Sequence, residues 1–459
     1  MTDPARAVVT GPVTGGSHGW AFGGPSTDLG RYGYREDEFF IEGTASRFAL
    51  SRGAQLGWDG RWQVHREETA PYKTRLLVIR PEDRAAFNGT VVMCWTNVSA
   101  GYDGFRGGDS LEILEGGYAY VAVSAQRVGV HGPQGLIAWD GQRYGSLAIR
   151  SDDYSFDIFT QVARALRSDR RREPVDPMGG LEVRTLVAQG ASQSAGRLAT
   201  YLNAVQPLVG VIDGFILSLY FGTGAPLTVG DAVVSLPPPG SREAIERPLV
   251  VGSHLLRNDL DVPVMVVNSE CESTPCYGVR QPDTDRYRYW EVAGTCHVSL
   301  QMVRKVALAS ERDFGVTRPA EVGINELPMA PVDDAAFHRM HQWVQGDSPP
   351  PIQPRIDFGG DPPQIIRDQN GIARGGIRLP QVEAPVAHNS AIPRTGDIWG
   401  RLGGSCLPFA PEKLRVLYGD GTEYLARFEQ AARAAEKVGV ILPRDTDALM
   451  ADASLNSSF

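Results

Sequence analysis

The sequence is poor in cysteine and carries no surplus of basic charge. Its 459 residues include five cysteines, Cys94, Cys271, Cys276, Cys296 and Cys406. So few cysteines, odd in number, argue against a disulfide scaffold and favour a reducing compartment. The 45 Lys and Arg residues are outnumbered by 54 Asp and Glu residues, which gives a net charge of −9. This balance excludes the general electrostatic attraction on which nucleic-acid binding depends.

Targeting and nucleotide-binding signals are also missing. Residues 1–16 lack the basic region and apolar stretch of a secretory signal, and no segment approaches the roughly 18 uninterrupted apolar residues of a membrane span. We therefore expect a cytoplasmic protein with no membrane partner. No GxGxxG opens a helix after the first strand and no GxxxxGK[ST] occurs, so we expect no cofactor, and the chemistry inferred below requires no metal.

Short apolar runs that alternate with helical patterns are present instead. Strands are predicted over residues 74–79, 90–95, 117–125, 184–188, 211–217, 263–267 and 287–292, and helices over 154–166, 195–202, 333–345 and 425–438. This alternation predicts the α/β class, with a mostly parallel central sheet and helices on both faces. Residues 1–70 read as an irregular segment with short strands, 71–350 as the core with lid-like insertions at about 223–261 and 298–331, and 351–459 as a C-terminal extension.

The run Gly190-Ala191-Ser192-Gln193-Ser194 lies between the strand ending at Ala188 and the helix expected from 195. In an α/β-hydrolase the nucleophile occupies such a strand-to-helix turn, in the pattern G-x-S-x-G. Here serine replaces the second glycine. Ser192 is the predicted nucleophile, and Ser194 is the rival because it also carries a hydroxyl.

A serine hydroxyl needs a base and an acid, which in this fold follow it in the order acid, then His. Glu270 and Glu272 come directly after the strand 263–267, and His297 follows the strand 287–292 in a Gly-Thr-Cys-His turn. His297 is the predicted base. Glu272 is the predicted triad acid, since the second acid of such a turn usually points at the histidine, and Glu270 remains the alternative.

The oxyanion hole needs two backbone N–H groups aimed at the developing negative oxygen. One is expected from Gln193, the residue after the nucleophile. The other is expected from Asn97 or Val98, in the polar, glycine-containing loop after the strand that ends at Trp95.

Several longer blocks resemble a known family. They are TAPYKTRLLVIRP (69–81), FNGTVVMCWTNVSAGYD (87–103), QGASQSAGRLATYLNAVQP (189–207), RQPDTDRYRYWEVAGTCH (280–297) and GGIRLPQVEAPVA (375–387). The chain resembles the bacterial "alpha/beta hydrolase 10" group (Abhydrolase_10), whose members are described mainly as serine esterases. The resemblance implies the α/β-hydrolase fold and a serine triad at the positions named above. It does not identify a substrate.

These inferences predict a serine-dependent ester hydrolase of a small-molecule ester, with an acyl-enzyme intermediate and a Ser192–His297–Glu272 triad. The alternatives are an acyltransferase, a lactonase or an amidase with the same triad. A non-catalytic binding protein of the same fold is a further class. The sequence leaves substrate and oligomeric state open.

Overall fold

The computed structural model describes residues 6–104, 107–167, 173–230, 250–317, 323–394 and 402–455. The chain divides into two compact units, Met1–Val264 with Val344–Asp347, and Met265–Trp343 with Ser348–Phe459. The domain boundaries expected from the sequence stay predictions. The lid-like insertions expected at 223–261 and 298–331 fall partly outside the described residues.

The first unit contains the larger part of the sheet. Its strands are β1 (Val8–Thr10), β2 (Tyr34–Leu50), β3 (Val64–Pro81), β4 (Thr90–Trp95), β5 (Ala119–Val123), β6 (Thr185–Ala191) and β7 (Gly214–Ser218), with a separate pair, β8 (Thr223–Gly224) and β9 (Val251–Ser253). The strand order is β1-β2-β3-β5-β4-β6-β7. Strands β5, β4, β6 and β7 run parallel, whereas β1, β2 and β3 join by antiparallel pairing.

The helices of this unit are α1 (Leu111–Glu115), α2 (Arg127–His131), α3 (Leu136–Trp139), α4 (Gly141–Tyr144), α5 (Ser155–Arg167), α6 (Gln193–Thr200) and α7 (Gln206–Val209). Every residue of β4, β5, β6 and β7 is buried, which explains their nearly continuous apolar sequence. Helix α5 packs on β2, where the Asp157 carboxylate accepts a hydrogen bond of 2.8 Å from the Ser46 amide.

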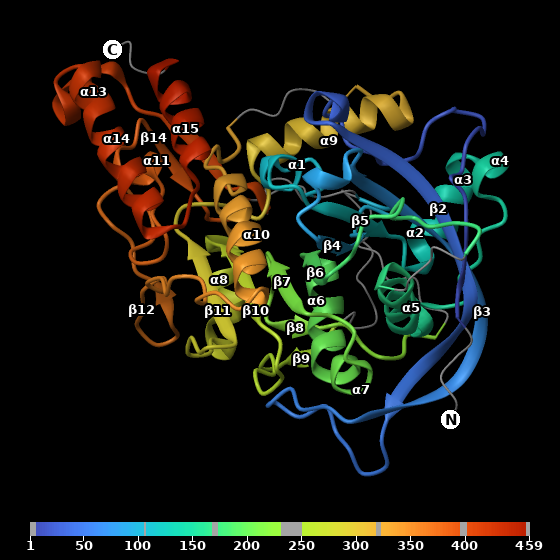
Figure 1. Cartoon of the computed structure of the whole chain (residues 1–459). Coiled ribbons are helices and arrows are strands. Elements are labelled where there is room, and N and C mark those ends of the chain that lie inside the picture. Colours follow the sequence, from blue (N-terminus) through green and yellow to red (C-terminus); the bar gives the residue numbers. More distant parts are fainter. Residues whose placement is uncertain are drawn as a thin grey trace. The chain divides into compact units, whose positions relative to one another are not determined.

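The N-terminal region differs from the sequence expectation of irregular structure with short strands. Strands β2 and β3 are 17 and 18 residues long and form the long curved ribbon at the blue end of the chain (Figure 1). The acidic residues that interrupt the apolar pattern of β2 are neutralised in the fold: Asp37 pairs with Arg80 at 2.9 Å and Glu38 with Arg143 at 2.6 Å. Because these partners are distant in sequence, the hydropathy pattern alone predicts only irregular structure with short strands in this segment.

The second unit contains β10 (Val264–Ser269), β11 (Tyr287–Val292), β12 (Phe358–Gly359), β13 (Gln364–Ile365), β14 (Ala387–Ser390) and β15 (Ser405–Pro408). Its helices are α8 (Glu270–Cys276), α9 (Leu300–Phe314), α10 (Ala330–Val344), α11 (Pro380–Glu383), α13 (Pro411–Tyr418), α14 (Gly421–Val438) and α15 (Pro443–Leu455). Strands β10 and β11 are neighbours and fully buried. In the described part of the chain, no helix combines the length and the apolarity needed to cross a membrane.

Candidate active site

Ser192 lies at the turn between β6 and α6 and has an unusual backbone. Its φ of 60° and ψ of −120° are outside the helical and extended regions, and only Leu219 shares a positive φ among the described non-glycine residues. Such a conformation costs on the order of 1–3 kcal/mol and persists where surrounding contacts impose it. Here the Ser192 amide donates to Ser218 O at 3.0 Å and its carbonyl accepts from the Gly196 amide at 3.2 Å. Ser192 makes no side-chain cap on α6 and stays partly exposed.

The residues around Ser192 explain the modified glycine pattern. A Cβ at Gly190 would lie 2.7 Å from Ser194 O, closer than real side chains approach, so glycine is needed there. Ser194 is buried, and its hydroxyl accepts a hydrogen bond from the Ala191 amide at 2.9 Å and donates to Ala191 O at 3.0 Å. Serine at the position of the second glycine therefore fastens the turn, and its hydroxyl faces away from solvent.

The loop after β4 contacts the same turn. The side-chain amide of Asn97 donates to Ala191 O at 2.9 Å, and Gly104 N donates to Asn97 O at 2.7 Å, which closes the loop at its base. Asn97 and Val98 are both buried. Gln193 is the first residue of α6, where a backbone amide has no acceptor within the helix. The three predicted oxyanion residues thus lie on two segments that are hydrogen-bonded at the Ser192 turn.

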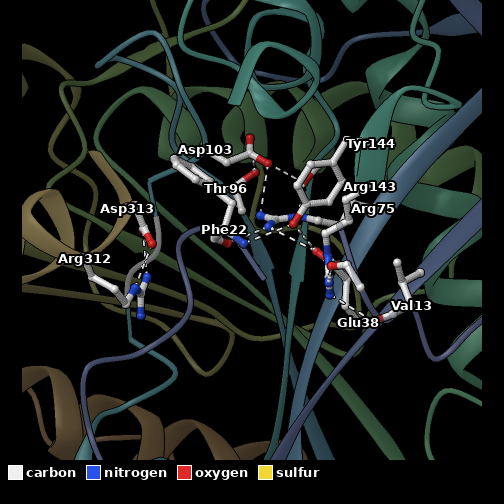
Figure 2. Close-up of polar contacts among 12 residues, drawn as sticks. Val13, Phe22, Glu38, Arg75, Thr96, Asp103, Arg143, Tyr144, Arg312 and Asp313 are labelled. Carbon is white, nitrogen blue, oxygen red and sulfur yellow. Dashed lines mark hydrogen bonds and ion pairs between the residues drawn. The ribbon is translucent and has the colours of Figure 1, made fainter. Parts of the chain in front are cut away.

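The far end of this loop is anchored by a buried ion pair. Asp103 is 1% exposed and its carboxylate lies 3.3 Å from Arg75 Nη2, on β3. It also accepts hydrogen bonds from Thr96 Oγ1 at 3.2 Å and from the hydroxyl of Ser124 (Figure 2). Asp103 therefore ties the loop to β3 and to the residues that directly follow β4 and β5.

Arg75 is shared between Asp103 and a second buried group. Its Nη1 lies 3.5 Å from Glu38 Oε1, which also accepts a hydrogen bond of 2.8 Å from the Tyr144 hydroxyl (Figure 2). Burial disfavours the charged guanidinium, but Tyr144, Asp103 and Glu38 outweigh burial and raise the pKa of Arg75. Sequence reasoning missed this network, although an arginine inside the apolar run TRLLVI was a signal of a buried counter-charge.

A second buried network holds the side chain of Gln193. Gln193 Nε2 donates to Gln126 Oε1 at 3.0 Å, Gln126 Nε2 donates to Asp152 Oδ2 at 3.1 Å, and Arg197 on α6 pairs with the same carboxylate at 2.7 Å. Trp95 Nε1 also donates to Gln126 Oε1, at 3.2 Å. The Asp152 carboxylate can only accept and the Trp95 indole can only donate, so Gln126 must direct Nε2 toward Asp152 and Oε1 toward Trp95. Because Gln126 Oε1 accepts, Gln193 must in turn present its Nε2. Burial lowers the pKa of Arg197.

In the second unit, His297 and Glu272 are in direct contact. His297 Nδ1 lies 2.7 Å from Glu272 Oε1, with His297 on the turn after β11 and Glu272 in the first turn of α8. Glu272 Oε2 accepts from the Ser269 amide at 2.9 Å, which is one half of a capping box at the start of α8, and from the Ser269 hydroxyl at 2.6 Å. A carboxylate accepts hydrogen bonds, so the imidazole tautomer that fits this contact is the one with its proton on Nδ1. His297 Nε2 is then the basic nitrogen.

Glu270, the alternative acid, has other partners. Its Oε1 lies 2.6 Å from Arg367 Nη1, and its Oε2 accepts a hydrogen bond of 2.7 Å from the Gly294 amide. Glu270 thus supports the turn that leads to His297. Arg367 lies in the C-terminal segment, where no sequence signal marked it.

The predicted residues are distributed over both units. Ser192, Gln193, Asn97 and Val98 belong to the first unit, and Glu272 and His297 to the second. Within the described ranges, no three His, Cys, Asp or Glu side chains are grouped to hold a metal ion. The first unit thus contains a partly exposed serine with a strained backbone. The second contains an imidazole that is oriented by a carboxylate.

Solved structures of low sequence identity resemble the chain. Brefeldin A esterase, a bacterial homologue of human hormone sensitive lipase, is 13% identical over 39% of this chain, which spans only 40% of that esterase, with a TM-score of 0.21. A serine hydrolase without a lid from Xanthomonas campestris is 15% identical over 53% of this chain and 88% of its own, with a TM-score of 0.27. Esterase Est22 is 12% identical over 59% and 80%, with a TM-score of 0.29.

No curated protein matches the sequence. The family model described as "Alpha/beta hydrolase domain" (Abhydrolase_10) matches residues 9–451, nearly the whole chain. The match agrees with the strand order of the first unit and with the strand-to-helix turn at Ser192. The chain belongs to this alpha/beta hydrolase domain family.

Proposed function

We propose that the chain is a serine hydrolase that cleaves a carboxylic ester through an acyl-enzyme intermediate. The observation that carries the proposal is the backbone of Ser192, a non-glycine residue with positive φ at a strand-to-helix turn whose hydroxyl does not cap the helix. A nucleophile elbow has these features because the sharp turn exposes the hydroxyl above the sheet. Membership of an alpha/beta hydrolase family supports the same chemistry.

In the proposed reaction, Ser192 Oγ attacks the ester carbonyl carbon while His297 Nε2 accepts the hydroxyl proton. Glu272, hydrogen-bonded to Nδ1 at 2.7 Å, stabilises the imidazolium and keeps Nε2 as the basic nitrogen. The proposal requires His297 Nε2 to reach Ser192 Oγ in the active protein.

The negative oxygen of the tetrahedral intermediate is stabilised by the backbone N–H of Gln193 and by that of Asn97 or Val98. Such preorganised donors lower the barrier because their dipoles are already oriented when charge develops. As the intermediate collapses, the bond to the alcohol oxygen breaks and His297 returns the proton to that oxygen. Water, deprotonated by His297, then attacks the acyl-enzyme and releases the acid.

A fluorophosphonate probe tests the nucleophile. The wild-type protein and the matched control Ser194→Ala should be labelled, whereas Ser192→Ala should not react. His297→Ala should lower ester turnover by several orders of magnitude, as loss of a triad base does. Labelling that survives Ser192→Ala would overturn the assignment of the nucleophile.

A panel of p-nitrophenyl esters, lactones, amides and acyl-acceptor alcohols tests the reaction type. Esters should be hydrolysed fastest. If lactones or amides were cleaved faster, the protein would be a lactonase or an amidase with the same serine chemistry. If the acyl group were transferred to the alcohol in place of water, it would be an acyltransferase. A folded protein that neither reacts with the probe nor turns over any substrate would be a binding protein of this fold.

A further inference from the structure

Two of the five cysteines directly adjoin the His297–Glu272 pair in sequence. Cys271 precedes Glu272 on α8, and Cys296 precedes His297 on the turn after β11. The reaction proposed above uses neither thiol. All five cysteines are free thiols in the structure.

The two chain segments that carry these thiols run side by side. The Glu270 amide donates to Thr295 O at 3.2 Å, and one residue beyond the thiols His297 Nδ1 contacts Glu272 Oε1 at 2.7 Å. Cys271 and Cys296 occupy the positions between these two contacts. Backbone pairing on one side and a side-chain bond on the other therefore hold the thiols opposite each other.

The thiols share one environment. Cys271 Sγ lies 3.6 Å from Ala391 O, and Cys296 Sγ lies 3.6 Å from the preceding carbonyl, Ser390 O. The neighbouring Cys271 thiol, together with burial, raises the pKa of Cys296. A disulfide needs the two sulfur atoms about 2.05 Å apart, and thiols on paired segments, at positions opposite each other, approach by rotation of their side chains.

Exposure distinguishes the two residues. Cys296 is 1% exposed, whereas Cys271 is only partly buried. An oxidant in solution therefore meets Cys271 first, and Cys296 is placed to react with the product. An accessible thiol beside a second, resolving thiol is a common feature of reversibly oxidised sites.

We propose that Cys271 and Cys296 form an oxidation site that reacts with hydroperoxides and closes to a disulfide beside His297 and Glu272. The Cys271 sulfur attacks the terminal oxygen of the hydroperoxide, the O–O bond breaks, and an alcohol, or water from hydrogen peroxide, leaves with one thiol proton. The Cys296 sulfur then attacks the resulting sulfenic acid and expels water, which takes the second proton. Two thiols and one hydroperoxide thus give one disulfide, one alcohol and one water.

The disulfide changes the contacts that orient the base. Both thiols lose their hydrogen bonds to Ser390 O and Ala391 O, and the segments on which His297 and Glu272 lie are drawn together at the adjacent residues. Because catalysis depends on placement to a fraction of an ångström, turnover falls as the cross-link forms. This consequence rests on the proposed function, whereas the disulfide itself does not.

The experiment treats the reduced full-length protein with hydrogen peroxide. Peptide mapping without reductant should recover a peptide pair linked through Cys271 and Cys296. The thiols that can be titrated should fall from five to three, because the cross-link consumes two of them. Ester turnover should decline in proportion to the cross-linked fraction and return with dithiothreitol.

Cys271→Ser and Cys296→Ser should each abolish the cross-link and the reversible loss of turnover. Cys276→Ser, on the same helix but fully buried, is the matched control and should retain both. Peroxide that leaves both thiols free in the folded wild type, or oxidises Cys271 without linking it to Cys296, would overturn the proposal. Fluorophosphonate labelling of the reduced protein separates the two hypotheses: failure to label Ser192 removes the hydrolase assignment, while the linked peptides still decide the oxidation site.

Discussion

Asp103 and Arg75 form a buried ion pair, 3.3 Å apart, that joins the loop containing Asn97 and Val98 to strand β3. Each residue is no more than 2% exposed. Asp103 has further hydrogen bonds from the ends of β4 and β5, so the loop is held at both its beginning and its end. The ion pair therefore supports the proposed oxyanion donors. Its effect on catalysis can be measured separately from its effect on the free energy of unfolding.

Asp103→Asn should lower kcat per active site. The amide keeps the shape of the side chain but loses the charge that holds Arg75, so the loop and its N–H groups shift. Loss of a whole oxyanion donor costs about 10²–10³ in kcat, and we expect about tenfold for this indirect change. Active-site titration with a fluorophosphonate should show that nearly all sites remain reactive.

Glu38→Gln is the matched control for Asp103→Asn. This substitution removes the charge of the other carboxylate that pairs with Arg75, which lies on β2, and leaves the contacts of the loop unchanged. Both substitutions should lower the free energy of unfolding, because each leaves a buried charge less compensated. Only Asp103→Asn should lower kcat per titrated site. Equal kcat losses in the two variants would show that the pair acts through stability alone.

Glu272→Gln should reduce kcat far more than Glu270→Gln on a short p-nitrophenyl ester. The first change removes the carboxylate that lies 2.7 Å from His297 Nδ1, and loss of the triad acid lowers kcat by roughly 10⁴. The second change weakens the contacts of Glu270 with Arg367 and Gly294 and leaves the imidazole its acceptor. A larger loss from Glu270→Gln would reverse the assignment of the acid.

Gly190→Ala should destabilise the turn at Ser192. The added Cβ would lie 2.7 Å from Ser194 O and 2.9 Å from Ser194 C, backbone atoms that cannot move away cheaply. Overpacking of this kind typically costs about 1–3 kcal/mol, measured as the free energy of unfolding in urea. Gly141→Ala, at a glycine with open space around it, is the control and should be neutral or slightly stabilising. An unchanged stability of Gly190→Ala would contradict the packing described here.

Tyr144 should contribute to a loss of stability at alkaline pH, together with the other buried tyrosines whose pKa is raised. Burial, with a further contribution from Glu38, raises the pKa of Tyr144 from 10.0 to about 12. Between these values the folded state holds a proton that the unfolded state has released. The stabilisation is therefore complete below pH 10 and is lost, at about 1.4 kcal/mol per pH unit, as the pH rises toward 12.

Urea unfolding from pH 8 to 11 measures this effect. Tyr144→Phe should be less stable at neutral pH, since it loses the hydrogen bond to Glu38, but its stability should fall less steeply with pH. Tyr277→Phe, at a residue that is 42% exposed, should keep the slope of the wild type. An identical slope for Tyr144→Phe and the wild type would refute the role of this tyrosine.

Much of the fold was readable from the sequence because its signals are local. The predicted strand 90–95 coincides with β4 and the strand 287–292 with β11, since uninterrupted apolar residues reflect burial on both faces. The turn at Ser192 was found in the same way: the small residues that a sharp turn needs are neighbours in the chain.

The full length of β2 and the first part of β3 escaped prediction for the opposite reason, whereas the predicted strand 74–79 lies within β3. Asp37 and Glu38 interrupt the apolar pattern of β2, and the arginines that neutralise them, Arg80 on β3 and Arg143 on α4, lie far away in the chain. Asp103 was missed for a similar reason. In the sequence it is an ordinary acidic residue of a polar loop, and only the fold places Arg75 beside it.

By itself, the sequence determined the class of the fold, the position of the strained serine, and the two turns that carry Glu272 and His297, because each depends on residues adjacent in the chain. Only the tertiary structure decided which carboxylate contacts the imidazole, which hydroxyl fastens the turn at Ser192, and which thiols lie opposite each other. The first and third of these relationships join residues far apart in the chain, and the second depends on the folded shape of the turn, so each is settled only when the core packs.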